Sequence, residues 1–433
     1  MTPVEIGSLG LAAMAVLIFT GIPIGIAMAV VGFVGFVMLS GLQPAMGLLM
    51  TVPYSTAANY TLSVVPLFIL MGELAYHSGV GEDLYQTANK WLGSLPGGLA
   101  MATIGAGSIF GAASGSSAAA TATLGSVSLP AMRKFGYTPG FASATVCAAG
   151  TLDIMIPPST AFIIYGMLTE TSVGQLFIAG IVPGFLLAAL YCVAVYFIAK
   201  RYPSVAPAGP ATTWREKVSS LGSCTAIVVI FIFVMGGMWV GMFTPTEAGA
   251  VGAFGSLLLM IWRRQLNVQN IVKSVTETAN ISAMIFLILI GASIFSYFMA
   301  ITQLPAAVAT YLKGLSVSPF TVVLGIMVLY FFLGWFMEEL SMIVLTTPLF
   351  WPVLQSMGVD PIWYGVMIIV SIEQGQLTPP VGLNINIMCT MAKDIPAMQL
   401  YRWVMPYVAV LLVFMGILFV FPQLATFLPK MMK

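Results

Sequence analysis

Long apolar segments dominate this chain and restrict the folds that it can adopt. A helix needs roughly 20 mostly apolar residues to cross a bilayer. Apolar runs lie near 6–20, 23–40, 61–77, 140–168, 174–199, 221–241, 245–262, 281–301, 361–390 and 402–423. Only 7% of the 433 residues are charged, whereas a soluble domain has about a quarter. We predict an all-α membrane protein, which excludes soluble enzymes, disordered tails and nucleic-acid binders.

Two further apolar stretches, 98–130 and 320–352, are interrupted near their middle. The first is broken by Gly111–Ser117 and the second by Gly334–Glu339. Each half has only about ten to sixteen residues, which is short for a crossing. We interpret both stretches as re-entrant hairpins. For the Gly/Ser run the alternative is close helix packing by small residues, which is common in membranes.

Prolines recur at a constant spacing of 222 residues. Pro245, Pro352, Pro361, Pro379 and Pro380 correspond to Pro23, Pro130, Pro139, Pro157 and Pro158, and Gly358 corresponds to Gly136. Because proline fixes φ and removes a donor, shared prolines indicate shared helix breaks. We predict two structural repeats, 1–200 and 223–433, joined by a linker at 201–222. Broken helices are expected at 140–168 and 361–390.

The placement of Lys and Arg predicts an orientation. Five crossings and one hairpin in each half would invert the second half relative to the first. With the Pro-rich segment Lys200–Lys217 in the cytoplasm, 12 of the 15 basic residues lie on that side. Only Lys313, Lys430 and Lys433 lie outside, as the positive-inside rule expects. We therefore predict inverted repeats with about 10–11 spanning helices plus two re-entrant hairpins.

Matching interrupted helices in inverted repeats are typical of secondary transporters whose site lies at the membrane midplane. Carbonyls just before Pro157 and Pro379 lose their usual donors, and such carbonyls, together with hydroxyls, coordinate small hard cations. A first cation site is predicted at Ser114, Ser117, Asp153, Ile156 and Pro158. Its repeat mate is predicted at Gly334, Gly375, Thr378 and Val381.

Acidic residues within apolar segments are candidate functional groups. Asp153 corresponds to Gly375 and is interpreted as a cation ligand or a titrating group. Glu73 and Glu247 lie near predicted helix ends and are also consistent with interfacial carboxylates. Substrate contacts are predicted at Ser116, Ser159, Glu338 and Asn384.

Several other features favour a passive structural role. Cys147, Cys192, Cys224 and Cys389 have no metal-binding spacing, and His77 is interpreted as an interfacial histidine.

No catalytic motif or nucleotide-binding loop occurs, so neither an enzyme nor an ATP-driven permease is expected. Segments near 81–95 and 267–280 are amphipathic and are expected to lie along the interface.

Several motifs resemble the large membrane subunit (DctM type) of TRAP transporters. They are Pro157-Pro-Ser159 followed by Ile163-Ile-Tyr-Gly166, the Ser-Gly-Ser hairpin, Gly334-x-Phe-Met-Glu338 and Leu377–Asn384. The resemblance covers essentially the whole chain. It implies an elevator-type transporter that imports a small organic anion by Na⁺ symport in the bacterial inner membrane. The placement of Lys and Arg, in turn, predicts a periplasmic N-terminus.

The resemblance also implies partners and cation ligands. The partners are a small four-helix membrane subunit, expected as a separate chain, and a soluble periplasmic substrate-binding protein. The Na⁺ ligands fall at the nine positions predicted above. Asp153 departs from the family pattern, in which we expect glycine, and its carboxylate would allow a proton to replace the cation. The alternatives are a self-sufficient cation-coupled symporter or antiporter of a related inverted-repeat family, and a channel or intramembrane enzyme.

Overall fold

The computed structural model describes residues 1–114, 117–315 and 317–432, and the side chains at 110–114 and 119 lie outside that description. All regular secondary structure in these residues is helical, with 20 α-helices and the 3-10 helix η1 (Tyr60–Ser63). This confirms the predicted all-α class. By length and composition, five described helices can each cross a membrane, or six if the bent pair α8–α9 counts as one span.

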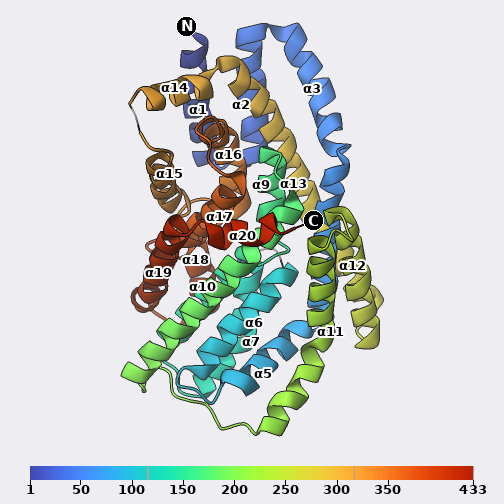
Figure 1. Ribbon diagram of the computed structural model, residues 1–433, viewed down its shortest axis with the longest axis vertical. Coiled ribbons are helices and arrows are strands. Elements are labelled where there is room, and N and C mark those ends of the chain that lie inside the picture. The colour runs from blue at the N-terminus through green and yellow to red at the C-terminus, as the bar shows by residue number, and fades with distance from the viewer. Residues whose placement is uncertain (115–116, 316, 433) are drawn as a thin grey trace.

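We divide the helices into two groups, the frame and the inner bundle, and α5 and α14 of the frame contact both (Figure 1). The frame consists of α1 (Pro3–Phe19), α2 (Ile24–Ser40), α3 (Leu42–Ala57), α4 (Val64–His77), α5 (Val80–Leu92), α11 (Trp214–Trp239), α12 (Pro245–Trp262), α13 (Val268–Thr302) and α14 (Leu304–Gly314). The inner bundle consists of α6 (Gly98–Ser114), α7 (Ser117–Lys134), α8 (Pro139–Met155), α9 (Thr160–Thr169), α10 (Val173–Arg201), α15 (Pro319–Leu333), α16 (Glu339–Ser356), α17 (Pro361–Leu377), α18 (Leu383–Met391), α19 (Ala397–Val420) and α20 (Gln423–Lys430).

Helix boundaries follow the same 222-residue spacing as the prolines. Helices α7 and α16 begin at Ser117 and Glu339, and α8 and α17 begin at Pro139 and Pro361. Corresponding helices also make corresponding contacts, since α2 packs on α13 and α4 packs on α12. The predicted hairpins are the helix pairs α6–α7 and α15–α16. The division into repeats 1–200 and 223–433 and their inversion stay predictions.

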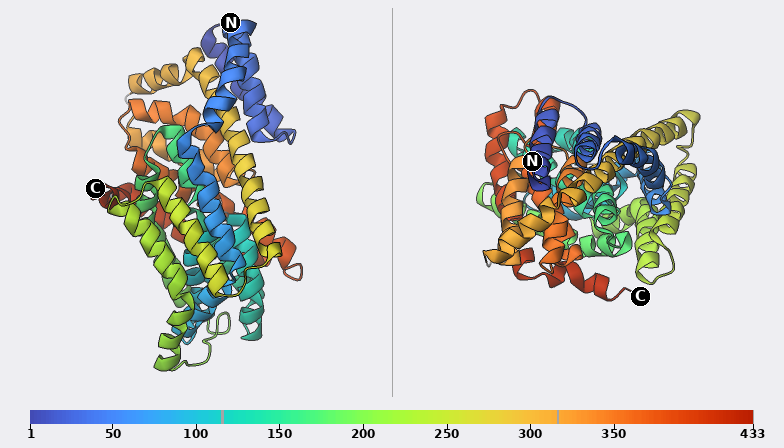
Figure 2. Two further views of the ribbon diagram at one scale, coloured as in Figure 1. Left: turned by 90° about the vertical axis from the view of Figure 1, so that its right-hand side faces the viewer. Right: turned by 90° about the horizontal axis from the view of Figure 1, so that it is seen from above.

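Three segments differ from the sequence-based expectations. Helix α3 was not expected, and it packs on α2 and α13 (Figure 2). The segment 267–280 is not a separate helix but the first part of the 35-residue α13, which has no proline within it. The connection between repeats is shorter than 201–222, because a Thr213–Glu216 capping box already begins α11 at Trp214.

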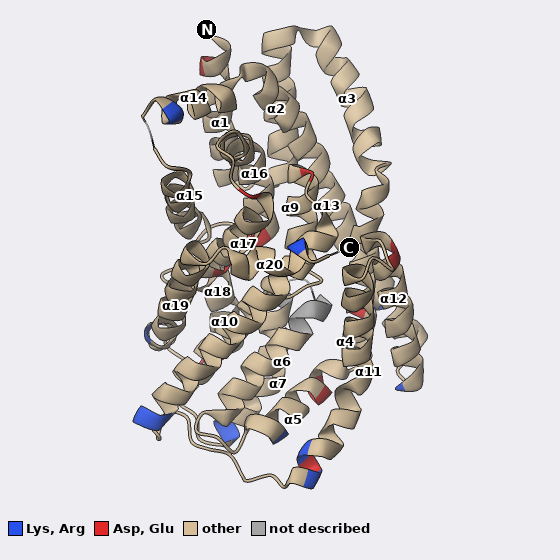
Figure 3. Cartoon of the chain, viewed as in Figure 1, with Lys and Arg blue, Asp and Glu red and all other residues tan. Residues whose placement is uncertain are grey.

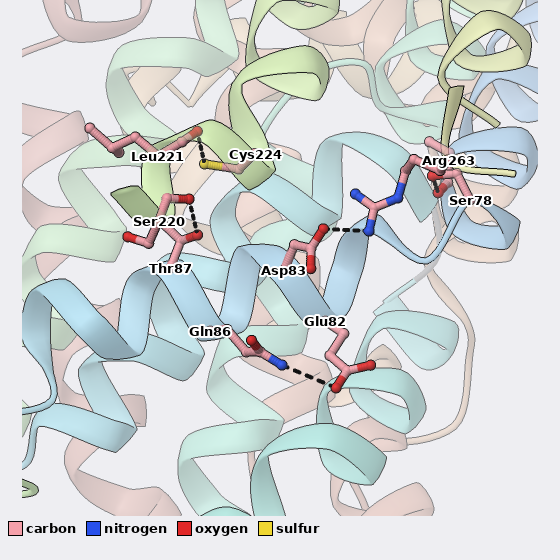
Figure 4. Close-up of polar contacts among 10 residues, drawn as sticks. Ser78, Glu82, Asp83, Gln86, Thr87, Ser220, Leu221, Cys224 and Arg263 are labelled. Atoms are coloured by element: carbon pink, nitrogen blue, oxygen red, sulfur yellow. Dashed lines mark hydrogen bonds and ion pairs between the residues drawn. The ribbon is translucent and has the colours of Figure 1, made fainter. Parts of the chain in front are cut away.

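Helix α5, at the expected amphipathic segment, is fastened to the frame and also packs on α6 of the inner bundle (Figure 4). The Thr87 hydroxyl donates to the Ser220 carbonyl of α11 at 2.9 Å. Asp83 forms an ion pair with Arg263, which follows α12. Helix α5 therefore connects the frame with the first hairpin.

Glycines allow α2 and α13 to approach each other at backbone distance. A Cβ atom added to Gly291 would lie 2.0 Å from the Gly25 carbonyl oxygen. One added to Gly32 would lie 2.8 Å from the Phe295 Cα. Since backbone atoms cannot rotate away as a side chain can, larger residues at this crossing would force the helices apart.

Gly291→Ala is expected to destabilise the frame by about 1–3 kcal/mol, the usual cost of overpacking. The measurement is thermal unfolding of the purified protein in detergent, in which the variant should unfold at a lower temperature. Gly236→Ala in α11 is the control, because a Cβ there meets nothing within 4 Å. Equal unfolding temperatures for Gly291→Ala and the parent protein would contradict this packing.

Candidate substrate and cation site

Each half contains one helix broken at a proline pair. Helix α8 ends at Met155, Ile156 is extended, and α9 starts at Thr160 with a bend of 40°. In the second half α17 ends at Leu377, Thr378 is extended, and α18 starts at Leu383. The Pro157–Pro158 and Pro379–Pro380 peptide bonds are both cis.

The breaks leave backbone carbonyls without their usual donors. Pro157 has no N–H for the Asp153 carbonyl, and Pro379 has none for the Gly375 carbonyl, which accepts instead from the Thr378 N–H at 3.3 Å. Nearby hydroxyls bind other carbonyls of the last turns. Ser159 Oγ donates to the Ile154 carbonyl at 2.6 Å, and Thr378 Oγ1 donates to the Gln374 carbonyl at 2.5 Å. The Ser159 and Thr378 hydroxyls thus help to hold the shape of each break.

At the second break, Gly375 contacts the second hairpin backbone to backbone. A Cβ added to Gly334, which follows α15, would lie 2.5 Å from the Gly375 Cα of α17. This brings together two of the residues predicted for the second cation site. Thr378 is buried three residues further along, and Val381 is partly buried.

A hydrogen-bonded network joins the first hairpin to both breaks. The Asn384 amide of α18 donates to Ser117 Oγ of α7 at 2.8 Å and to the Cys147 carbonyl of α8 at 3.4 Å. The Ser117 backbone N–H donates to Glu339 Oε1 of α16 at 3.4 Å. Gln376 Nε2 of α17 donates to Glu339 Oε2 at 2.5 Å. Five helices therefore meet around these side chains, which we term the central network.

The predicted residues occupy different parts of this region. Ser117 and Asn384 contact each other directly, although one was expected at a cation and the other at the substrate. Ile156 packs against Gly184 of α10, so only its backbone is suited to a ligand role. Pro158 lines a small apolar cavity with Met71 of α4.

The other predicted residues are Glu338, Ser114 and Ser116. Glu338 is partly buried and occupies the N-cap position of α16 without a side-chain capping hydrogen bond. Ser114 ends α6, with its side chain outside the description. Ser116 lies outside the described residues.

Glu339 and Gln376 are both buried in the central network, but neither was predicted as a site residue. Glu339 carried a signal, because it is an intramembrane acid 222 residues after Ser117. Nothing in the sequence indicated Gln376, because its role depends on which face of α17 meets α16.

A further ion pair lies at the edge of the inner bundle. Arg133, near the end of α7, donates to Asp394 at 2.9 Å in the turn after α18. The hydrogen bond from Arg133 lowers the pKa of the Asp394 carboxyl below its ordinary value. This exposed pair links the first hairpin to the second broken helix.

Comparison with known proteins identifies the family. Residues 11–424 match the family model described as "Tripartite ATP-independent periplasmic transporter, DctM component". The chain belongs to this family. It is therefore a TRAP transporter permease and an integral membrane protein, not an enzyme, as the sequence motifs indicated.

Two relatives and one solved structure show the extent of the similarity. The chain is 35% identical to the C4-dicarboxylate TRAP transporter large permease protein DctM of Pseudomonas aeruginosa, covering 87% of this chain and 88% of that protein. It is 32% identical to the sialic acid TRAP transporter large permease protein SiaM of Vibrio cholerae, covering 96% of each. The YdaH transporter of Alcanivorax borkumensis shares the fold, with a TM-score of 0.69 at 16% identity over 88% of this chain and 89% of that one.

Glu339→Gln is expected to lower solute uptake about tenfold or more. The amide can accept from either Gln376 or Ser117 but places an NH₂ group opposite the other donor, and a hydrogen bond to a charged group contributes roughly 1.5–3 kcal/mol. Uptake into vesicles containing the reconstituted transporter measures the effect. Glu5→Gln is the control, because Gln also serves in the exposed capping box of α1. Full activity of Glu339→Gln would remove the central network from the transport site.

Proposed function

We propose that this TRAP permease is the large subunit of a tripartite transporter that imports a small organic anion by Na⁺ symport. One observation carries the proposal. All 15 Lys and Arg residues lie outside both breaks and both hairpin turns, although an anion needs positive charge in a buried site. Cations held by the break carbonyls would supply that charge. The solute and the cations would then bind together, which is the basis of coupling.

The chemistry of the breaks suits Na⁺ and a carboxylate solute. Carbonyl and hydroxyl oxygens are ligands for hard cations. The Gln376 amide retains one N–H that suits a carboxylate, whereas both N–H groups of Asn384 already donate within the central network. Helices α9 and α18 begin at the breaks, and their N-termini favour negative charge. The named solutes of the two relatives, a C4-dicarboxylate and sialic acid, are both organic acids.

The partners and the location follow from the family. We infer a small four-helix membrane subunit, a soluble periplasmic substrate-binding protein and a bacterial inner membrane around the chain. Basic residues gather toward the lower end of the molecule in Figure 3, near the connection between α10 and α11. This supports a cytoplasmic connection and a periplasmic N-terminus under the positive-inside rule.

Unequal contacts of the two hairpins support an elevator mechanism. The first hairpin packs on frame helices α4 and α5 mainly through α6, whereas the second packs on α13 and α14 through its other arm, α16. Helices related by the 222-residue spacing therefore sit differently against the frame. A rigid inner bundle displaced along the frame would produce this difference, and the opposite displacement would exchange the two arrangements.

A polar pocket lies between α7 of the first hairpin and the frame. It has a volume of about 510 Å³ and is lined by Thr123 and Ser126 of α7, His77 of α4 and Lys273 of α13. At the corresponding place in the second half, Met299, Leu304 and Met342 are buried in the main apolar core. We infer that this arrangement is open toward the cytoplasm and closed toward the periplasm.

Reconstitution tests the proposed function. Vesicles with the large and small subunits, the binding protein and an inward Na⁺ gradient are expected to accumulate the solute carried by the binding protein. Omitting any one component should abolish accumulation, because each performs a separate step. Uptake by the large subunit alone would favour a self-sufficient symporter. Uptake driven equally well without Na⁺ by a proton gradient would contradict Na⁺ coupling.

Cysteine accessibility tests the elevator arrangement. In a cysteine-free background, Thr123→Cys is expected to react with a membrane-impermeant thiol reagent applied from the cytoplasmic side. Leu345→Cys is the matched variant, because Leu345 lies 222 residues after Thr123. It should react from the periplasmic side only when the inner bundle moves. Simultaneous reaction of both, unchanged by Na⁺ and solute, would contradict alternating access.

A further inference from the structure

A buried carboxylate stands apart from the central network. Glu373 lies in α17, two residues before the contact between Gly375 and Gly334, and it is fully buried. Neither of its carboxylate oxygens has a hydrogen-bond partner among the described residues. A buried carboxylate in this state is strongly unfavourable, so it requires a positively charged partner or the loss of its own charge.

A second acid lies near it. Asp153, at the end of α8, is also fully buried and interacts electrostatically with Glu373 across the α8–α17 contact. Tyr191 of α10 is an electrostatic neighbour of Glu373 as well. Two acids from different halves of the chain thus lie together where α8, α10 and α17 meet.

The repeat does not account for this pair. The residue 222 positions from Asp153 is Gly375, and the residue 222 positions from Glu373 is Thr151. The equivalent position in the other repeat is uncharged for both acids, so the repeat does not produce a second pair. The two predicted cation sites, one in each repeat, can be built from carbonyls at the breaks alone. The two acids are therefore not needed for those sites.

Glu373 takes part in none of the ion pairs found among the described residues, which include His77–Glu73, Arg133–Asp394 and Arg263–Asp83. The helices packed on α17 contribute other titratable groups: Tyr165 on α9, Tyr330 on α15, Glu338 and Glu339 on α16, Cys389 on α18 and Tyr407 on α19. Lys430 of α20 lies beside Asp360, just before the opposite end of α17, and Arg402 of α19 is exposed.

We propose that Glu373 and Asp153 bind an additional monovalent hard cation, Na⁺, between α8 and α17. Two carboxylates supply hard oxygen ligands, and the nearby Tyr191 hydroxyl is a further oxygen donor. No group of three or more His, Cys, Asp or Glu side chains in the described residues is arranged for a metal ion. A divalent ion is less suitable, because Ca²⁺ takes six to eight oxygens and Mg²⁺ retains water.

This site would add one cation to those held by the breaks. Its part in transport rests on the proposed Na⁺ symport, whereas its occupancy can be measured without transport. If it fills and empties in each cycle, every solute molecule is accompanied by one more positive charge. If it stays filled, it stabilises the α8–α17 contact in both states.

Direct Na⁺ binding tests the site. Equilibrium binding of radioactive Na⁺ to the purified complex of large and small subunits should saturate at one ion fewer per complex in Glu373→Gln than in the parent protein. Glu373→Asp keeps the charge and should retain the full number of ions with at least tenfold weaker binding at one site. Glu247→Gln is the matched control, since this exposed acid of α12 also lies in a capping box that tolerates Gln.

Folding and function are separated by further measurements. Na⁺ should still raise the thermal unfolding temperature of Glu373→Gln through its remaining sites, which shows that the variant is folded. Unchanged Na⁺ number and affinity in folded Glu373→Gln would overturn the site and leave the pair neutralised by protons. If Na⁺ binding falls as expected but parent uptake ignores Na⁺, the site stands and the proposed symport fails.

Discussion

Backbone polar groups inside a membrane must find partners within the protein, and the rest of this structure depends on that constraint. Unbroken helices meet it by themselves, whereas the proline pairs at the ends of α8 and α17 do not. The fold buries the first break completely and the second in part. The Ser159 and Thr378 hydroxyls bind carbonyls of the last turns, and Gly334 lets a hairpin touch the second break at backbone distance. In the proposed function, carbonyls at these breaks bind the coupling cations.

The scarcity of charge follows from the same constraint and determines the chemistry of transport. A site with permanent basic residues would attract the anion equally on both sides of the membrane. In the proposed mechanism, cations that enter with the anion supply the positive charge instead. Cation release would therefore weaken solute binding on the far side of the membrane. In the proposed mechanism, the frame, fastened by contacts such as Gly25–Gly291, is the fixed surface along which the inner bundle moves.

The sequence predicted the features that depend on the backbone. Prolines mark where α8 and α17 begin and end because proline acts on its own chain, so Pro139, Pro361 and the two proline pairs could be interpreted without a structure. Contacts between helices could not be predicted in this way. The link between Glu339 and Gln376 depends on the rotation of α16 against α17, and the pairing of Asp153 with Glu373 depends on two distant segments meeting. Helix α3 and the uninterrupted α13 were not predicted. The pattern of apolar and polar residues indicates which segments are buried, but it does not show where a helix continues without a break.

The most direct test of the central claim measures solute binding to the reconstituted complex of large and small subunits at different Na⁺ concentrations. If cations supply the positive charge of the site, solute affinity should rise at least tenfold from Na⁺-free to saturating conditions. By linkage, saturating solute should raise Na⁺ affinity by the same factor. Solute affinity that is equal with and without Na⁺ would contradict the account, because the anion would then be held by the protein alone.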